Sequence, residues 1–313
     1  MSISERSYDK REVASFSLTN APLGELSNFH PRLPLLVPTE AGLIRLDSSE
    51  TFYQADKFRD LPEIQKEVIE AANAHKNGPR GGKDAATAKS SLISDDWVRG
   101  RSVQSMRYVL RLKYSQHFEA VGAALDATGD RPIVEFSRHD AFWGAKPEGP
   151  NSLRGVNALG RLWMEIREER RKDPDFCRYA VEPYDTRLLG SPITRWVRPA
   201  LILNAHAVGT DVPGAVYVGR PTKWGNPVSV NDDTPRGQAI IAFLDHLRAR
   251  PDLVEGARKE LAGRDLICWC APRPCHAEVW RHVAEGNPVP DTWDVSPRGK
   301  PPTADSTQSS FGF

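Results

Sequence analysis

The chain has almost no net charge and lacks any long hydrophobic run. Its 313 residues include 42 basic and 41 acidic side chains, which leaves a formal charge of +1. No overall field therefore favours nucleic acid or a membrane surface as a partner. No apolar segment approaches the roughly 18 residues that a membrane helix needs. The first residues, "MSISERSYDKRE", are polar and lack the apolar core of a signal peptide, so we expect a cytoplasmic protein.

Cysteine is also scarce, and its distribution is uneven. Only four cysteines occur, and Cys268, Cys270 and Cys275 lie within eight residues of one another. This pattern differs from the spaced cysteines of a secreted disulfide framework. It indicates a metal site, a thiol site or close packing.

The length suits two domains, and composition shifts suggest where they end. We predict a flexible arm over residues 1–13, a mostly helical α+β domain over 14–172, a linker over 173–199, a small α/β domain over 200–286 and a disordered tail over 287–313. The linker contains four prolines and no sustained periodicity, and the tail is rich in Pro, Ser and Thr.

Local patterns predict the elements of both domains. In the first domain we expect strands over 16–20, 42–47 and 131–137, a helix from 49, helices over 63–75 and 157–171, a helical stretch over 95–128 broken once, and a flexible loop over 77–91 that runs into a helix. In the second domain we expect strands over 213–219 and 264–270, a helix over 236–250, a short charged helix and a last helix over 276–284.

The segment "SETFYQADKF" (49–58) predicts a helix with two different faces. Asp47 and Glu50 have the spacing of a capping box. On a helical wheel one face carries Glu50, Tyr53, Gln54 and Lys57. The other face carries Phe52, Ala55 and Phe58, which can anchor the helix in a core. The polar face is either exposed to solvent or one wall of an active site.

A second segment with candidate site residues is "VEFSRHDAFWG" (134–144). A buried strand ends there, and Asp140 and Trp143 follow in a loop. Polar groups at a strand end often belong to a ligand site, although a turn with a packed tryptophan would look the same. Asn157 opens the next helix and is either an N-cap or a site residue, and Trp97 in "DDWVRGR" suits a core.

Taken in order, five segments resemble the NADAR family: "LSNFHP" (26–31), "SETFYQADKF", "DDW…R…M" (96–106), "TGDRPIVEFSRHDAFWG" (128–144) and "NALGRLWMEIR" (157–167). The resemblance covers about residues 14–172. It implies a compact, mostly helical α+β fold that hydrolyses an N-glycosidic bond without a metal or redox cofactor. Members of this family act on riboflavin intermediates or remove ADP-ribose from guanine bases.

The resemblance also implies roles for individual residues. The catalytic candidates are Glu50, Asp140 and Lys57; the substrate-binding candidates are Asn28, Tyr53, Gln54, Trp97, Arg101, Trp143 and Asn157. Two carboxylates can divide proton transfer and stabilisation of an oxocarbenium ion. We assign Glu50 as general acid or base and Asp140 as stabiliser or water-orienting base, and the reverse assignment stays open.

One departure from the family concerns a basic residue. The family usually has a Gly-Arg pair soon after an Ala-Lys, whereas here Ala88-Lys89 is followed by "SSL". If that arginine holds a substrate phosphate, we expect Lys89, Arg99 or Arg101 to replace it. The departure affects the choice of substrate more than the choice of reaction.

The second domain carries two motifs of its own, "GRPTKWGNP" (219–227) and "CWCAPRPCHAEVW" (268–280). Together they resemble a domain family without an assigned function. The candidate contacts are Arg220, Lys223, Trp224, Asn226, Cys275 and His276. The first motif suits phosphate binding with base stacking, or a structural loop. For the second motif we weigh a zinc site, a helix N-terminal thiolate, and buried small residues with a histidine cap; we favour the last and assign no metal.

The sequence thus predicts a hydrolase that removes ADP-ribose from a guanine base of a nucleotide or nucleic acid. A second substrate is a phosphoribosylamino-pyrimidine of flavin synthesis. An alternative of another class is a non-catalytic module that binds ADP-ribose or a modified nucleotide. The presence of two acids argues against this alternative, because binding an anion does not need them.

Overall fold

The computed structural model describes residues 4–17, 19, 22–76 and 78–296. The chain divides into two compact units, residues 1–196 and 197–313. Across the described residues, no helix is both long and apolar enough to cross a membrane.

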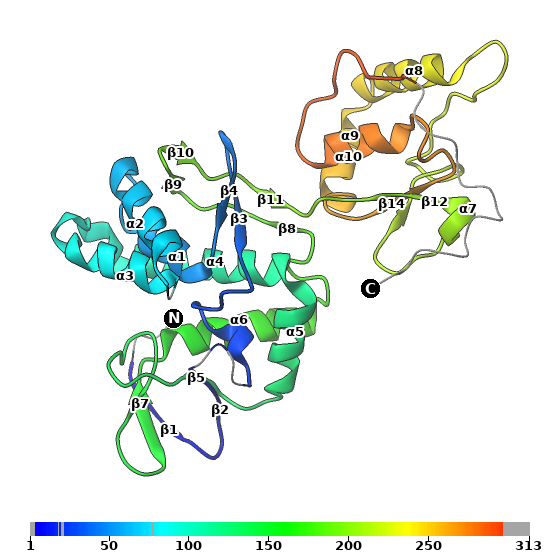
Figure 1. The fold of residues 1–313 in the computed structure, drawn as a ribbon. Coiled ribbons are helices and arrows are strands. Elements are labelled where there is room, and N and C mark those ends of the chain that lie inside the picture. Colours follow the sequence, from blue (N-terminus) through cyan, green and yellow to red (C-terminus); the bar gives the residue numbers. More distant parts are fainter. Residues whose placement is uncertain (1–3, 18, 20–21, 77, 297–313) are drawn as a thin grey trace. The chain divides into compact units, whose positions relative to one another are not determined.

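The first unit has the predicted α+β fold, in which helices dominate and the sheets are small (Figure 1). Its elements in chain order are β1 (Arg6–Asp9), β2 (Ala14–Phe16), β3 (Leu35–Thr39), β4 (Gly42–Leu46), α1 (Ser49–Asp56), α2 (Pro62–Ala74), α3 (Pro79–Ala88), α4 (Ser102–Gln116), α5 (Phe118–Ala127), β5 (Ile133–Glu135), β6 (Lys146–Pro147), β7 (Ser152–Gly155), α6 (Ala158–Lys172), β8 (Ala180–Val181), β9 (Arg187–Leu188), β10 (Ser191–Pro192) and β11 (Trp196–Val197).

The described strands of this unit form five small sheets, two of which pair β9 with β10 and β8 with β11. Strands β1, β7 and β6 form an antiparallel sheet, β2 pairs in parallel with β5, and β3 forms a hairpin with β4. Helix α6 packs against β5, α4 and α5 (Figure 1). Trp163 of α6 is fully buried, and its indole nitrogen donates to the carbonyl of Leu26 at 2.9 Å. The aromatic and aliphatic faces of α1, α4 and α6 thereby share one core.

Helix α6 can lie close to β5 because residue 160 is glycine. A Cβ atom at Gly160 would lie 2.2 Å from the carbonyl oxygen of Ile133. No side chain fits at that distance, so the glycine permits the helix and the strand to approach. This contact places the start of α6 beside the end of β5, where the predicted site residues lie.

The ends of the first unit differ from the prediction. The expected flexible arm contains β1, whose Tyr8 pairs with Leu153 and is buried, so residues 6–9 are part of the fold. The strand expected over 16–20 instead ends at Phe16, and residues 18 and 20 lie outside the described residues. The segment expected as a linker contains β8 to β11 and, up to Trp196, belongs to the first unit.

The expected loop over 77–91 is mostly helix α3. Its two glycines suggested flexibility, but they are buried against α2. A Cβ atom at Gly81 would lie 2.2 Å from the carbonyl oxygen of Ala71. The glycines therefore serve close packing of two helices rather than chain flexibility; Asn77 lies outside the described residues.

Helix α1 is buried along its whole length. Its N-cap is Ser48, whose hydroxyl accepts from the backbone nitrogen of Thr51 at 3.2 Å, and not Asp47 as the spacing suggested. Phe52 and Phe58 are buried in the core, as predicted. The polar face is buried too, because only 5% of Glu50 and 2% of Gln54 is exposed. A solvent-exposed face is therefore excluded.

The second unit is a small α/β domain, as predicted. Its elements are β12 (Ile202–Asn204), α7 (Ala205–Val208), β13 (Val216–Tyr217), α8 (Arg236–Arg248), α9 (Pro251–Glu260), β14 (Leu266–Cys268) and α10 (His276–Ala284). The three strands are parallel in the order β12, β14, β13. Helix α10 packs against β14 and α9, and Trp280 lies in this core. Of the expected disordered tail, residues 297–313 lie outside the described residues.

Candidate active site

A cavity of about 660 Å³ lies in the first unit between α1, α3 and the segment that follows β5. A volume of this size is in the range of small-molecule sites. The predicted site residues that line it are Asn28, Glu50, Tyr53, Gln54, Lys57, Asp140 and Trp143. The whole polar face of α1 therefore forms one wall, because residues spaced by three or four positions share a helical face.

Glu50 lies in the first turn of α1, and Gln54, one turn further along the helix, contacts it. The side-chain nitrogen of Gln54 donates to Glu50 Oε1 at 2.7 Å. Burial raises the pKa of Glu50, and the nearby Lys83, Gln54 and Lys57 partly oppose that rise. A carboxyl with a raised pKa is suited to exchange protons near neutral pH.

Glu135 is a third acid of the cavity, and it was not among the residues predicted from the sequence. It is the last residue of β5. Burial, with the charges of Glu50 and Asp140 next, raises the pKa of Glu135 to about 8. The only indication of a site residue in the sequence is that Glu135 follows the apolar residues Ile133 and Val134 of a strand. A surface acid at the end of a strand has the same pattern.

Asp140 is oriented by the loop in which it lies. Its Oδ1 atom accepts hydrogen bonds from the backbone nitrogens of Phe142 and Trp143, both at 2.8 Å. The ring of Trp143 meets the ring of Tyr53 edge to face with 5.4 Å between centroids. Asp140 and the rings of Trp143 and Tyr53 therefore lie together in the cavity wall.

Two buried amide oxygens of the wall have no hydrogen-bond partner among the described residues. They are Asn28 Oδ1 and Gln54 Oε1. Buried polar atoms are normally satisfied, and both residues line the cavity. Hydroxyl or amino groups of a bound ligand can supply the missing donors.

Three basic side chains line the same cavity: Lys57, Arg80 and Lys83. Burial lowers the pKa of Lys57, with a smaller opposing effect of Glu50. Lys83 lies 5.7 Å above the ring of Phe29. Arg80 and Lys83 are on α3 and were not predicted, because that segment was expected to be a loop.

The residues suggested as substitutes for the family's arginine do not line the cavity. Lys89 pairs with Glu67 at 2.6 Å, and Arg99 lies beside Asp95 on the surface. Arg101 forms ion pairs with Asp56 and Asp96 instead. Of the three cations that line the cavity, Lys57 follows α1, and Arg80 and Lys83 are on α3, more than one turn before Lys89.

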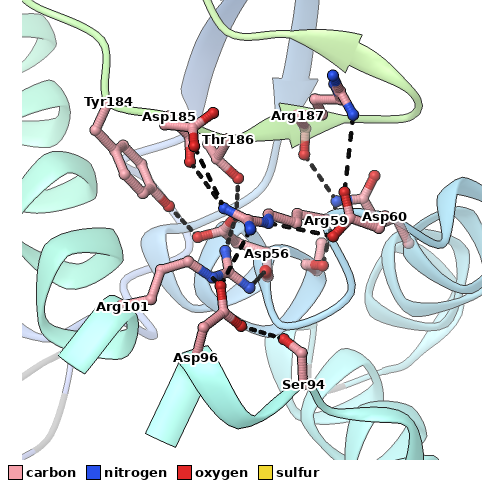
Figure 2. A network of polar contacts seen from close by, with 12 residues as sticks. Asp56, Arg59, Asp60, Ser94, Asp96, Arg101, Tyr184, Asp185, Thr186 and Arg187 are labelled. Carbon is pink, nitrogen blue, oxygen red and sulfur yellow. Dashed lines mark hydrogen bonds and ion pairs between the residues drawn. The ribbon is translucent and has the colours of Figure 1, made fainter. Parts of the chain in front are cut away.

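Arg101 and Trp97 support α1 rather than line the cavity. Arg101 is buried and pairs with Asp56 at the end of α1 and with Asp96 (Figure 2). Asp56 also accepts hydrogen bonds from the hydroxyls of Tyr184 and Thr186. The guanidinium of Arg101 stacks on Trp97 at 4.9 Å. Both residues were predicted to bind substrate, but neither is among the residues that line the cavity.

Asn157 was also predicted to bind substrate, but it joins β5 to α6. It is fully buried in a left-handed conformation with φ of 53°. Its amide donates to the carbonyl of Ile133 at 2.8 Å and accepts from the backbone nitrogen of Glu135 at 3.1 Å. These bonds fix the backbone of Glu135, so Asn157 is a positioning residue for that acid.

In the second unit, the "GRPTKWGNP" motif is mostly structural. Trp224 is 4% exposed and packs edge to face on Trp280, which excludes base stacking by its ring. Lys223 pairs with Glu260 at 2.7 Å. The side chain of Asn226 bonds to the backbone of Ala239 at 3.0 Å. Among the predicted contacts of this unit, Arg220, Asn226, Cys275 and His276 line a cavity of about 240 Å³.

Comparison with known proteins matches both units to families. Residues 15–171 match the model of the NADAR domain, and residues 203–286 match a domain of unknown function, DUF4326. The chain is also similar to the NMR structure of the E. coli protein YbiA, with 29% identity over 52% of this chain and 86% of that chain and a TM-score of 0.42.

Three curated proteins are similar to about half of this chain. A chloroplastic riboflavin biosynthesis protein of Zea mays is 32% identical over 162 residues, 50% of this chain and 25% of that protein. A riboflavin biosynthesis protein of Vibrio vulnificus is 36% identical over 151 residues, 47% of this chain and 35% of that protein. The chain thus spans about a third or less of these two relatives.

The third relative is matched over most of its length. An N-glycosidase of Nostoc punctiforme is 31% identical over 153 residues, 48% of this chain and 87% of that protein. The match of the family model and this relative confirm the resemblance found in the sequence motifs. The chain therefore belongs to the NADAR family.

Proposed function

We propose that the first unit is a hydrolase that cleaves an N-glycosidic bond. The observation that carries the proposal is a pair of acids with raised pKa values, Glu50 and Glu135, facing a cavity that also contains Asp140. Two carboxyls that interact in one cavity can divide the roles of proton donor and proton acceptor. The name of the Nostoc relative agrees with this reaction class.

In the proposed reaction, water attacks C1′ of a ribose while the bond from C1′ to nitrogen breaks. Glu135 keeps its proton at neutral pH and donates it to the departing base. Glu50 accepts a proton from the attacking water. Asp140, held by two backbone nitrogens, stabilises the positive charge that develops on the ribose. This assignment adds Glu135 to the pair of acids expected from the sequence.

The proposed substrate is a phosphorylated N-riboside. Arg80 and Lys83 on α3, with Lys57, can neutralise a phosphate, and arginine matches phosphate oxygens in a bidentate geometry. A phosphoribosylamino-pyrimidine of flavin synthesis is favoured by the names of two relatives. ADP-ribosylated guanine is the second candidate, because the same three cations can neutralise a diphosphate. The absence of the family's Gly-Arg pair does not decide between the two candidates, because the cavity contains these other cations.

The purified full chain tests this proposal when it is incubated with each substrate and the products are identified by mass spectrometry. Release of ribose 5-phosphate or of ADP-ribose is the expected result and identifies the substrate. If both substrates stay intact while ADP-ribose binds in a 1:1 complex by calorimetry, the first unit is a binding module and the proposal is wrong.

The pH dependence of activity is a second prediction. Because the pKa of Glu135 is raised to about 8, kcat/KM is expected to fall as the pH rises through about 8, where this acid loses its proton. The Glu135→Gln variant is expected to have a kcat about 10²–10⁴-fold lower and to lose this decrease of kcat/KM at alkaline pH.

The matched control is Glu148→Gln, which replaces an acid that is half exposed and pairs with Arg154. A wild-type rate that stays constant to pH 10 would contradict the assignment of Glu135.

The phosphate site gives a third prediction. Arg80→Met and Lys83→Met are each expected to raise KM about 10-fold or more, since charged hydrogen bonds contribute roughly 1.5–3 kcal/mol. The KM of the same substrate without its phosphate should not change. Lys89→Met is the control, because Lys89 follows the same helix but pairs with Glu67. Equal effects on both forms of the substrate would exclude a phosphate contact.

A further inference from the structure

The second unit holds a buried cluster of three metal-ligating side chains. Cys268 ends β14, Cys275 is the N-cap of α10, and His276 is the first residue of that helix. Their ligand atoms all lie within 4.8 Å of one another, and all three residues are buried. The Nδ1 atom of His276 lies 3.9 Å from the sulfur of Cys268 and 3.8 Å from that of Cys275.

The imidazole of His276 is oriented as a ligand. Its Nε2 atom lies 2.9 Å from the carbonyl oxygen of Val218. A carbonyl oxygen only accepts, so Nε2 carries the hydrogen and Nδ1 has a free lone pair. That lone pair faces the two thiols. A hydrogen bond from the second ring nitrogen to a backbone carbonyl is the usual support of a metal-binding histidine.

The backbone explains how two neighbouring residues can reach one ion. Cys275 has an extended conformation (φ −144°, ψ 141°), whereas His276 is already helical. The change of conformation between them brings both ligand atoms to the same side. The adjacent Cys275 and His276 can therefore both reach one ion.

Cys270 supplies a fourth candidate from the loop between β14 and α10. Its thiol interacts with those of Cys268 and Cys275 and with the side chain of Arg236. Cys270 and Arg236 line the same cavity of about 240 Å³. Zinc with three thiolates and one neutral imidazole has a net charge of −1, which Arg236 and the neighbouring Arg220 can balance.

We propose that Cys268, Cys270, Cys275 and His276 bind one zinc ion. In a tetrahedral site with Zn–S of about 2.3 Å and Zn–N of about 2.0 Å, sulfur and nitrogen ligands lie about 3.5 Å apart. The two separations of 3.8 and 3.9 Å from His276 Nδ1 therefore need only small adjustments, whereas the thiol of Cys270, which is not in the group of ligand atoms within 4.8 Å of one another, has to move closer to complete the site. Zinc would join the end of β14 to the start of α10, two segments that flank the cavity with Arg220 and Arg236. The proposal is independent of the reaction proposed for the first unit.

Metal analysis of the full chain, purified without a polyhistidine tag, tests the proposal. We expect about one zinc per chain, and cobalt(II) added to the metal-free protein should produce the visible absorption of a tetrahedral thiolate site. Both measurements use the wild-type protein and so do not depend on a variant that folds. Folded, reduced protein that has no zinc and shows no such absorption with cobalt(II) would overturn the proposal.

Variants test the individual ligands. Cys268→Ser and His276→Gln are expected to lower zinc content to a small fraction of the wild-type value, whereas Cys177→Ser, a free cysteine of the first unit, should leave it unchanged. Cys270→Ser is expected to lower zinc affinity at least about 100-fold and to weaken the thiolate-to-cobalt absorption. An unchanged cobalt spectrum in this variant would exclude Cys270 as the fourth ligand. Circular dichroism verifies that each variant is folded.

Discussion

Replacing Glu50 by glutamine is expected to lower kcat by about 10²–10⁴-fold, which is the typical contribution of a positioned acid or base. The amide has nearly the same shape but cannot accept the proton of the attacking water. Steady-state rates on whichever substrate is cleaved provide the measurement. A variant with wild-type kcat would mean that Glu50 does not take part in proton transfer.

The stability of this variant distinguishes a catalytic from a structural effect. Burial raises the pKa of Glu50, so the folded state disfavours its ionised form. Any stabilisation from the protonated acid is fully present at low pH and is lost as the pH rises through the folded-state pKa. A neutral amide escapes this loss, so the melting temperature of Glu50→Gln at neutral pH should equal or exceed that of the wild type.

The matched control for this prediction is Glu63→Gln. Glu63 is also an acid in the first turn of a helix, α2, but it is exposed to solvent. Its replacement should change neither kcat nor the melting temperature. Loss of activity in both variants would indicate a general effect of helix N-terminal charge rather than a role of Glu50 in the cavity.

Removing the carboxylate of Asp56 is expected to destabilise the first unit by about 3–5 kcal/mol, because the buried charge of Arg101 loses its buried partner and keeps only the more exposed Asp96. The side chains of Asp56 and Arg101 are only 1% and 6% exposed. Asp56 also holds the hydroxyls of Tyr184 and Thr186 (Figure 2). Urea denaturation of Asp56→Ala, followed by tryptophan fluorescence, measures the loss.

A pair on the surface is the control for the Asp56 network. Asp95 lies 3.7 Å from Arg99, and their side chains are 91% and 80% exposed. Exposed pairs contribute about 0–1 kcal/mol, so Asp95→Ala should have little effect. The double variant Asp56→Ala/Arg101→Met should recover part of the stability, because it removes both buried charges. If Asp56→Ala and Asp95→Ala were equally mild, the network would not stabilise the unit.

The Asp56 network matters for the site because it anchors the end of the helix that carries Glu50. Asp56 is the last residue of α1, and Tyr53 of the same helix packs on Trp97 with 5.0 Å between ring centroids. Arg101 in turn stacks on Trp97. Two residues expected to touch the substrate therefore act through α1, and their replacement should affect stability more than substrate affinity.

The sequence by itself determined the family, the fold class of both units and the helical face that carries Glu50. These inferences depend on local spacing and on the order of short motifs, both of which can be read along the chain. The burial of Phe52 and Phe58 followed from the same periodicity. The α+β and α/β assignments followed from the alternation of elements.

Only the tertiary structure decided which other side chains share the cavity with Glu50. Glu135 became an acid with a raised pKa because α1 and the loop after β5 enclose it. Arg80 and Lys83 reach the cavity because the glycines of α3 permit contact with α2, although the same glycines resemble a loop in the sequence. Trp97 and Arg101 do not line the cavity, and Arg101 instead pairs with Asp56, which also accepts a hydrogen bond from the distant Tyr184.

The same limit applies to the second unit. Three cysteines and a histidine lie close together in the sequence, yet the sequence pattern favoured buried small residues with a histidine cap over a metal site. The convergence of Cys268, Cys275 and His276 depends on the parallel strands and on the conformation at the start of α10. Ligand geometry and burial are products of long-range packing, and no local pattern in the chain specifies them.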